Sequence, residues 1–579
     1  MNISKKILYI LDKYRNQLPF ISILLLFNSI IDVIGISFLP LIISFIINDN
    51  NNELIIFSYK LPLNIHDLLG AFCIFLVIFF FVKSVISFYI QRKILKYAYS
   101  VRVNIVSKIV NNFNQISIEN FFRKKTSDLI LNSITHVGVF TDGVLIPVAR
   151  SISEILVLVG LFILISFQNF IVMLLLLSII ISIFTLYFLA IRTKLYIYGK
   201  IMSVSEGDII KNLAYLIDGF REIKLLNKIY YFTENILKNL DKYSHSGVNS
   251  RSIQLIPRYI FEFSIITFVL FLIYFSLTYN FVSNEELITL LGFFVIASIR
   301  IIPSINVISL SISTVRSSAY AIESIYKDIN QIKIDKMYLE DKTEANKNFN
   351  FNKLNFNNVS FKYIESQNDI LTNVNFELKD GDIIGIFGKS GVGKSTFLDL
   401  LLGLLKPSNG DIEITDKNNN IFCNTKRDEV IFWQNQISYL PQQTFLIDDS
   451  VYKNITLDNK NRNSNFNQIK YSINKALLDD LFKNEFDYLT KSIGERGEYL
   501  SGGQKQRLAF ARSIYSKRKI LVLDEITSSL DEVTEKELFN FIYGLKGEYT
   551  IILISHNIEM LQKCNKLYEI KDNKVTQIK

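Results

Sequence analysis

The first 312 residues of this 579-residue chain are dominated by long apolar runs. Six of these runs reach the roughly 20 residues that a helix needs to cross a bilayer. Short connections follow the first, third and fifth runs, whereas long charged segments follow the second and fourth. The pattern predicts a membrane domain of six helices, at residues 20–47, 68–90, 145–167, 170–191, 259–281 and 287–311.

The charges between these runs predict how they are oriented. The connection at 48–67 and the turn before the sixth run are acidic, while lysine and arginine gather at the opposite ends, as at Lys5, Arg92 and Arg192. Because basic residues mark the cytoplasmic side of a membrane, both termini are expected in the cytoplasm. The first run is too long for a cleaved signal, so it is expected to be a retained span.

The long charged segments at 91–142 and 192–258 are too polar for lipid and too periodic for loose loops. We expect them to be helices that continue well into the cytoplasm. The next segment, 313–352, loses the apolar runs and ends in polar residues, which predicts a linker. Beyond it, strand patterns alternate with helical patterns, as in an α/β nucleotide-binding domain. The predicted division is therefore a membrane domain at 1–325, a linker at 326–352 and a nucleotide-binding domain at 353–579.

A phosphate-binding loop of the form G-x-x-x-x-G-K-S follows an apolar strand at 384–387. Its glycines let backbone N–H groups approach phosphates, and the helix that begins near Lys394 points its positive end at them. Lys394 is expected to contact β- and γ-phosphate oxygens, and Ser395 to bind Mg²⁺. The predicted nucleotide-binding residues of this loop are Gly388, Lys389, Ser390, Gly391, Val392, Gly393, Lys394, Ser395 and Thr396.

A second apolar strand ends in Asp524 and Glu525. Asp524 is expected beside the metal, and Glu525 can act as the general base toward the attacking water. Gln442, after Leu440 and Pro441, has the spacing for a contact with the metal and the water. His556 ends a further apolar strand and is expected at the γ-phosphate; most lone histidines are structural, but this chain has only four.

Three more features complete the predicted nucleotide site. The segment Leu500-Ser-Gly-Gly-Gln504 opens a helix, so that Ser501, Gly502, Gly503 and Gln504 can bind the γ-phosphate of a second subunit's nucleotide. Asp531 is expected at the seam between the two subunits. Tyr363, about 25 residues before the phosphate loop, is placed to stack on adenine, although an aromatic residue in a strand is more often part of the core.

The composition limits the choice of partners. The net charge of +9 could suggest nucleic acid, but the basic residues flank apolar runs and form no single tract, so no nucleic-acid partner is expected. The three cysteines, Cys73, Cys423 and Cys564, have neither metal-ligand nor disulfide spacing.

Six charges lie within or at the edges of the apolar runs: Asp32, Lys83, Glu154, Arg258, Glu262 and Arg300. A charge in mid-membrane costs roughly 2.5–3.5 kcal/mol, so such residues usually face a partner or a cavity. One interpretation is three interhelical ion pairs, since acids and bases balance. The other is that Lys83, Arg258 and Arg300 line a substrate cavity and bind an anionic group. Arg150 and Glu154, four residues apart on one helix, are expected to form a local pair.

The phosphate loop, the LSGGQ segment and the strand ending in Asp524 and Glu525, placed after six membrane spans, resemble an ABC exporter half-transporter over essentially the whole chain. The segment at 494–497, Gly-Glu-Arg-Gly, is similar to one typical of exporters. The resemblance implies ATP and Mg²⁺ as cofactors, alternating access, and short coupling helices near 116–122 and 218–225 that rest on the ATPase domains. It also implies a homodimer, or a heterodimer with a sibling half; the intact motifs favour the homodimer.

A narrower resemblance concerns the substrate. Pro257 and Arg258 with Glu262, and the segment Arg300-Ile-Ile-Pro-Ser-Ile-Asn306, are similar to PglK-type flippases. These move lipid-linked oligosaccharides on polyprenyl pyrophosphate across the bacterial inner membrane, which implies that location and a lipid or lipid-linked glycan substrate. The alternative is a multidrug or peptide/bacteriocin exporter. Six spans exclude a soluble ABC ATPase of translation or repair, and the complete motif set speaks against a catalytically silent membrane protein.

Overall fold

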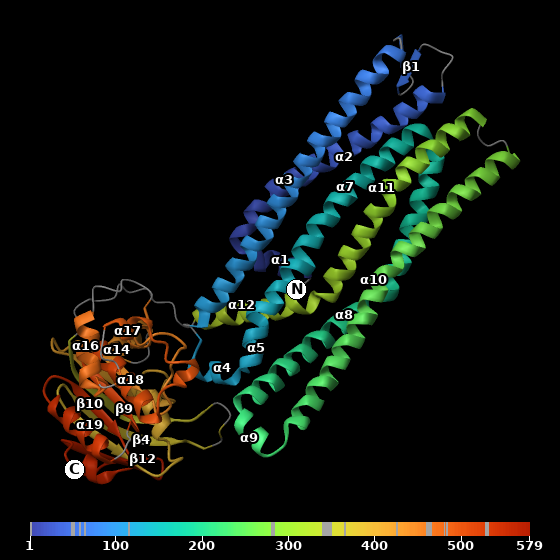
Figure 1. Cartoon of the computed structure of the whole chain (residues 1–579). Coiled ribbons are helices and arrows are strands. Elements are labelled where there is room, and N and C mark those ends of the chain that lie inside the picture. Colours follow the sequence, from blue (N-terminus) through green and yellow to red (C-terminus); the bar gives the residue numbers. More distant parts are fainter. Residues whose placement is uncertain are drawn as a thin grey trace. The chain divides into compact units, whose positions relative to one another are not determined.

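The computed structural model describes residues 3–47, 53–56, 59–62, 65–113, 116–279, 284–337, 350–363, 366, 368–423, 427–458, 466–479, 481, 485–526 and 532–579. The chain forms two compact units (Figure 1). The first comprises Met1–Ile116 and Phe121–Asp335, and the second Ser117–Asn120 and Lys336–Lys579.

The first unit is helical apart from one short hairpin. The described residues contain six helices long and apolar enough to cross a membrane, which confirms the six predicted spans. In chain order the elements are α1 (Ile3–Leu11), η1 (Asp12–Gln17), α2 (Leu18–Ile47), β1 (Glu53–Ile56), β2 (Tyr59–Pro62), α3 (Ile65–Phe113), α4 (Ile118–Arg123), α5 (Thr126–Ile130), η2 (Leu131–His136), α6 (Val137–Phe140), η3 (Thr141–Leu145), α7 (Ile146–Gln168), α8 (Phe170–Asp218), α9 (Phe220–Leu225), α10 (Ile229–Tyr279), α11 (Asn284–Ser317) and α12 (Ala319–Met337).

Three of these helices are far longer than a bilayer requires. α3 and α8 have 49 residues each and α10 has 51, so each spans roughly 75 Å at about 1.5 Å per residue, against about 30 Å of hydrocarbon. The charged segments after the second and fourth spans are therefore helical continuations of those spans, as predicted. The short helices α4 and α9 occupy the places where the chain turns back, and α9 lies at the far end of the α8–α10 pair in Figure 1.

The segment predicted as a linker begins inside a helix. α12 runs to Met337, so the first twelve residues of 326–352 are helical; residues 338–349 lie outside the described part of the chain. The helix begins with buried residues that precede the predicted linker, Ala321, Ile322 and Ile325, and it continues into the polar segment.

The second unit contains two sheets. One has six strands in the order β12-β11-β5-β10-β9-β8, parallel except for β12, and the other has four antiparallel strands in the order β4-β3-β6-β7. The strands are β3 (Phe351–Phe361), β4 (Leu371–Lys379), β5 (Ile383–Phe387), β6 (Asn409–Asp416), β7 (Ile421–Cys423), β8 (Ile437–Leu440), β9 (Ile520–Asp524), β10 (Thr550–Ile554), β11 (Lys566–Lys571) and β12 (Lys574–Gln577). The helices are α13 (Lys394–Leu401), α14 (Arg427–Gln436), α15 (Val451–Thr456), α16 (Phe466–Lys475), α17 (Glu485–Thr490), η4 (Glu495–Gly497), α18 (Gly502–Tyr515), α19 (Glu532–Gly544) and α20 (Ile558–Leu561).

The central parallel strands are apolar throughout because both of their faces are buried. Along β9, Leu521 and Leu523 belong to one hydrophobic core, whereas Ile520 and Val522 belong to the other. The same alternation occurs in β5 and β10. Polar residues can therefore appear only where these strands end, and the ends of β5, β9 and β10 lie at one edge of the sheet.

Candidate nucleotide site

The phosphate loop leaves β5 and ends at the first residue of α13. Gly391 and Gly393 have positive φ values, +83° and +101°, which side chains other than glycine rarely adopt. At Gly388 a Cβ atom would lie 2.5 Å from the carbonyl oxygen of Ile570, so only glycine fits there. The Nζ atom of Lys394 donates to the carbonyl oxygen of Gly388 at 3.0 Å, which closes the loop on itself.

Three side chains that the sequence placed in the site meet at the carboxylate of Glu525. Lys394 Nζ lies 3.4 Å from its Oε1, and His556 Nε2 lies 2.7 Å from the same oxygen. Gln442 Nε2 donates to Oε2 at 2.5 Å. The side chains of Lys394 and Glu525 are 11% and 14% exposed, so this charge pair is well shielded from water. The described residues thus bring the phosphate loop and the ends of β9 and β10 to one point.

The backbone fixes the position of Glu525. Its φ is +50°, an uncommon value for a residue other than glycine, and its N–H donates to the carbonyl oxygen of Ile554 at 2.9 Å. Strained residues of this kind gather at functional sites. The turn after β9 therefore directs the Glu525 side chain toward Lys394 and His556.

Asp524 precedes Glu525 and lies in a different environment. Burial and the adjacent Glu525 raise the pKa of its carboxyl group, and the Tyr439 hydroxyl donates to its Oδ2 atom at 3.3 Å. Asp399 of α13 is also close: burial and the charge of Asp524 raise its pKa to about 6. Sequence reasoning missed Tyr439 and Asp399, although their positions, three residues before Gln442 and five after Lys394, could have drawn attention to them.

Tyr363 lies beside the first turn of α13. Its hydroxyl is 3.3 Å from the Thr396 hydroxyl, and its ring packs edge-on against Phe361 with 5.0 Å between centroids. In the same loop Lys389, Ser390, Gly391 and Ser395 are exposed, Val392 is partly exposed and Thr396 is buried. The tyrosine is thus next to the phosphate loop, and its stacking on adenine remains a prediction.

The LSGGQ segment opens α18, as predicted. Ser501 is the N-cap: its hydroxyl accepts from the Gln504 N–H at 3.3 Å, while the Ser501 N–H donates to Gln504 Oε1 at 2.8 Å. Within the described residues, no hydrogen bond or ion pair joins Ser501, Gly502, Gly503 or Gln504 to the cluster around Glu525. The other residue assigned to the subunit seam, Asp531, lies outside the described part of the chain.

The residues present fit a magnesium nucleotide. The glycine loop presents backbone rather than side chains, and at Gly391 no atom lies within 4 Å of the place of a Cβ. The Ser395 hydroxyl, the Gln442 amide oxygen and the Asp524 carboxylate are hard oxygen donors, which Mg²⁺ prefers. The backbone groups of the loop and these three oxygen donors are therefore suited to bind the phosphates and the metal.

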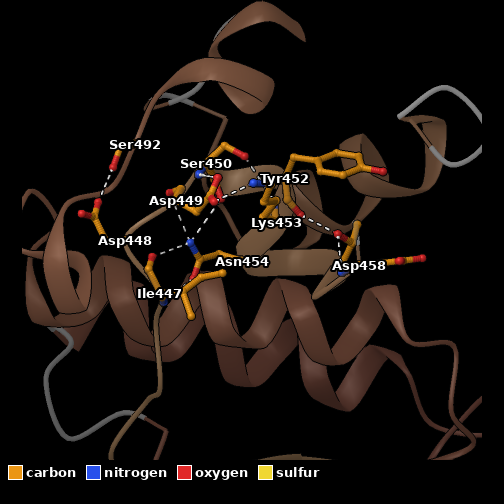
Figure 2. Close-up of polar contacts among 10 residues, drawn as sticks. Ile447, Asp448, Asp449, Ser450, Tyr452, Lys453, Asn454, Asp458 and Ser492 are labelled. Atoms are coloured by element: carbon orange, nitrogen blue, oxygen red, sulfur yellow. Dashed lines mark hydrogen bonds and ion pairs between the residues drawn. The ribbon is translucent and has the colours of Figure 1, made fainter. Parts of the chain in front are cut away.

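The segment after Gln442 is held by one buried asparagine (Figure 2). Asn454 is fully buried; its Nδ2 atom donates to the carbonyl oxygens of Ile447, Asp449 and Ser450 at 2.9, 3.3 and 3.2 Å, and its Oδ1 atom accepts from the Ile447 N–H at 2.9 Å. Arg512 of α18 donates to the Asn454 carbonyl oxygen at 2.7 Å. The helix that begins with LSGGQ is thereby attached to the segment that follows Gln442.

In the membrane unit, four of the six intramembrane charges form one cluster. Lys83 of α3 lies 2.8 Å from Asp32 of α2. Arg300 of α11 lies 3.1 Å from Asp32 and 3.4 Å from Glu154 of α7. Ser304 also donates to Glu154, at 2.6 Å. The interhelical interpretation therefore holds for these two acids and two bases.

The remaining charges behave differently. Arg258 and Glu262 of α10 are both exposed, and neither forms a hydrogen bond or ion pair with any residue that the structure describes. The predicted local pair of Arg150 and Glu154 is wrong: Glu154 faces α11, and Arg150 is exposed. A helical i,i+4 pair stabilises by only about 0.2–0.5 kcal/mol, so a shielded partner on another helix prevails.

Comparison with known proteins agrees with this geometry. The ABC transporter family model matches residues 371–528. A putative export ATP-binding/permease protein of Rickettsia typhi is 34% identical over 38% of this chain and 37% of its own length. The nisin transport ATP-binding protein NisT of Lactococcus lactis subsp. lactis is 31% identical over 38% of this chain and 36% of its own length. The chain spans about a third of the length of the curated relatives it matches.

The fold of the whole chain has a counterpart among solved structures. A bacterial Atm1-family ABC exporter with ATP bound superposes with a TM-score of 0.77 and 16% identity, covering 97% of this chain and 95% of that one. The helices and the site thus define a multi-pass membrane protein with a C-terminal ABC ATPase domain. Its fold is that of an ABC exporter, in which one membrane domain is fused to one ATP-binding cassette.

Replacing Asn454 with alanine should destabilise the ATPase domain by about 2–3 kcal/mol, because several buried backbone groups lose their partner together. The thermal midpoint of the purified full-length protein measures this effect. Asn435→Ala, at an exposed position of α14, is the matched control and should change the midpoint little. Equal midpoints for the two variants would contradict the role given to Asn454.

The pKa of Asp399 predicts a pH-dependent stability. Because folding raises this pKa from 3.8 to about 6, the folded chain retains a proton between those values, and the free energy of unfolding falls as pH rises through this window. Asp399→Asn should therefore stabilise the protein at pH 7.5 by roughly 1–2 kcal/mol, allowing for solvent screening, and by less near pH 4.5. Thermal midpoints without nucleotide at both pH values test this, with Asp411→Asn at an exposed position of β6 as control. A pH-independent difference would exclude the Asp399 titration.

Proposed function

We propose that this protein is an ATP-driven exporter, which couples ATP hydrolysis to movement of a substrate across the membrane. The observation that carries the proposal is the convergence of Lys394, Gln442 and His556 on Glu525, at the end of buried parallel strands. The ABC transporter match over 371–528 and the exporter fold support it.

Each residue would have a distinct part in hydrolysis. Lys394 and the loop amides would bind the β- and γ-phosphates, and Glu525 would accept a proton from the attacking water. Gln442 and His556, both bonded to Glu525, would orient the carboxylate and the γ-phosphate. Bound Mg²⁺, held by Ser395, Asp524 and Gln442, would neutralise phosphate charge.

A second subunit would complete the site. Ser501 and Gln504 cap their own helix and form no bond to the Glu525 cluster within the described residues. A helix N-terminus with free amides binds phosphate well, so the LSGGQ end of α18 is suited to a nucleotide held by another chain. We propose a homodimer with two ATP sites, in which Asp531 lies at the seam; a heterodimer with a sibling half is the alternative. No nucleic-acid partner is proposed.

The substrate that the charges favour is an anionic lipid, and within that class a lipid-linked oligosaccharide. Arg258 of α10 offers an exposed guanidinium that has no partner among the residues that the structure describes. Lys83 and Arg300 could also bind a phosphate group if they released the carboxylates that they now contact, Asp32 and Glu154. The side chain of Arg300 is 32% exposed. Guanidinium groups bind pyrophosphate in two-pronged geometry, which suits a polyprenyl-pyrophosphate headgroup. Such a protein would lie in a bacterial inner membrane with its ATPase domain in the cytoplasm.

A peptide or drug exporter is the second candidate. The match to a nisin transport protein favours it, although that match covers only 38% of this chain. The two candidates differ in what they require of Arg258: an anionic headgroup needs its charge, whereas a neutral or cationic substrate does not.

The assignment of the base can be tested by Glu525→Gln. The variant should bind MgATP normally and lose ATP turnover by at least about a hundredfold, because only the proton acceptor is altered. Lys394→Ala, in contrast, should weaken nucleotide binding itself. Fluorescent ATP binding and phosphate release, measured on both purified variants, separate the effects. Hydrolysis at the wild-type rate by Glu525→Gln would show that the base is another residue.

The substrate assignment can be tested on Arg258. Arg258→Gln should stop flipping of a polyprenyl-pyrophosphate glycan in proteoliposomes while thermal stability and basal ATPase stay unchanged, because the side chain has no partner within the described residues. Arg150→Gln, another exposed base at the edge of a span, is the matched control and should flip normally.

The paired bases should respond differently. Lys83→Gln leaves Asp32 with fewer partners in an apolar setting and should lower stability, and Lys83→Gln combined with Asp32→Asn should restore it. Normal flipping by Arg258→Gln would exclude the headgroup role and favour the drug or peptide exporter.

A further inference from the structure

Tyr439 lies at the predicted metal-binding edge but belongs to none of the motifs. It is on β8, the edge strand of the six-stranded sheet, where it pairs with Val522 of the neighbouring parallel strand β9. Side chains alternate along a strand, so Val522 and Asp524 point to the same face. The Tyr439 ring therefore reaches Asp524 diagonally, and its hydroxyl donates to Oδ2 at 3.3 Å.

The same face carries a second acid. Residues of α13 pack in the same hydrophobic core as Val522, and Asp399 of this helix is close enough for its charge and that of Asp524 to affect each other. Glu525 adds a third negative charge next to Asp524. A carboxylate between two other acids tends to turn away from them or to hold a proton, and both responses weaken it as a metal ligand.

Tyr439 opposes this tendency. Among the described residues, its hydroxyl is the only side-chain group that donates a hydrogen bond to Asp524. This hydrogen bond ties one carboxylate oxygen to the edge strand and limits rotation of the carboxylate, as outer partners of metal ligands do.

We propose that Tyr439 is a positioning residue for Mg²⁺: its hydroxyl holds the Asp524 carboxylate in one orientation for the metal. The proposal rests on the proposed ATP hydrolysis and adds a residue on which the metal dependence of that reaction relies. Among the described residues Tyr439 forms no hydrogen bond with Lys394, Glu525 or His556, so its effect is expected on metal affinity before it is expected on maximal turnover.

The test is the Mg²⁺ dependence of ATPase activity in full-length Tyr439→Phe protein. Loss of the hydroxyl should raise the half-saturating Mg²⁺ concentration roughly tenfold, as loss of outer partners of metal ligands does elsewhere. ATP binding in the presence of EDTA and the thermal midpoint should stay close to wild type. Tyr543→Phe is the matched control, because this tyrosine also donates its hydroxyl, to the Met560 carbonyl oxygen, in the same domain and away from the site.

A second measurement separates metal affinity from turnover and from folding. In the Glu525→Gln background, Mn²⁺ binding in the presence of ATP can be titrated by electron paramagnetic resonance. Tyr439→Phe should weaken it by a similar factor, and Tyr543→Phe should not. An unchanged Mn²⁺ affinity, or an unchanged Mg²⁺ half-saturation in an active enzyme, overturns the proposal. Failure of the proposed function would appear in the wild-type protein instead, as the absence of Mg²⁺-dependent ATP hydrolysis.

Discussion

The candidate site depends on one constraint, the burial of three parallel strands on both faces. β5, β9 and β10 carry apolar side chains alternately into two hydrophobic cores, so they have no position for a polar group until they end. Parallel strands end at the same edge. The phosphate loop after β5, the acids after β9 and His556 after β10 therefore meet, although more than 160 residues separate the first from the last. The loops contribute the polar and charged groups, and the hydrophobic cores fix the position of the edge from which the loops start.

Specific partners fix the polar side chains at this edge of the sheet. Glu525 is fixed by a positive φ and by the Ile554 carbonyl oxygen, and its two oxygens contact Lys394, His556 and Gln442. The carboxylate of Asp524, one residue earlier, accepts a hydrogen bond from Tyr439. Adjacent acids in one turn thus acquire different surroundings, which suits the proposed division between a metal ligand and a proton acceptor. Different surroundings allow two adjacent acids to serve different functions at the same pH.

Local patterns in the sequence predicted most of this arrangement, and pairings between distant segments account for the rest. Six spans, the helical continuations to Asp218 and from Ile229, and a helix opening at LSGGQ follow from periodicity and capping residues, and all are confirmed. The position of Tyr439 before Gln442 was a usable signal, but its contact with Asp524 was not predictable, because it forms only once β8 has paired with β9. Arg150 and Glu154 were paired wrongly since helical spacing says nothing of α11, where Arg300 and Ser304 lie. Within 326–337 polar composition concealed the second half of a helix.

The intramembrane bases differ in the free energy that each would gain or lose on binding an anion. Lys83 and Arg300 already contact Asp32, so a phosphate that takes either base leaves a carboxylate without full compensation in a region of low dielectric. Arg258 has no such partner among the described residues, and exposing its guanidinium to hydrocarbon is itself unfavourable. An anionic headgroup that binds Arg258 removes that cost, whereas one that binds Lys83 or Arg300 first adds a new one. The cluster of α2, α3, α7 and α11 therefore links four helices. Arg258, without a partner among the described residues, is the base whose free energy an anionic substrate of the proposed kind would lower most.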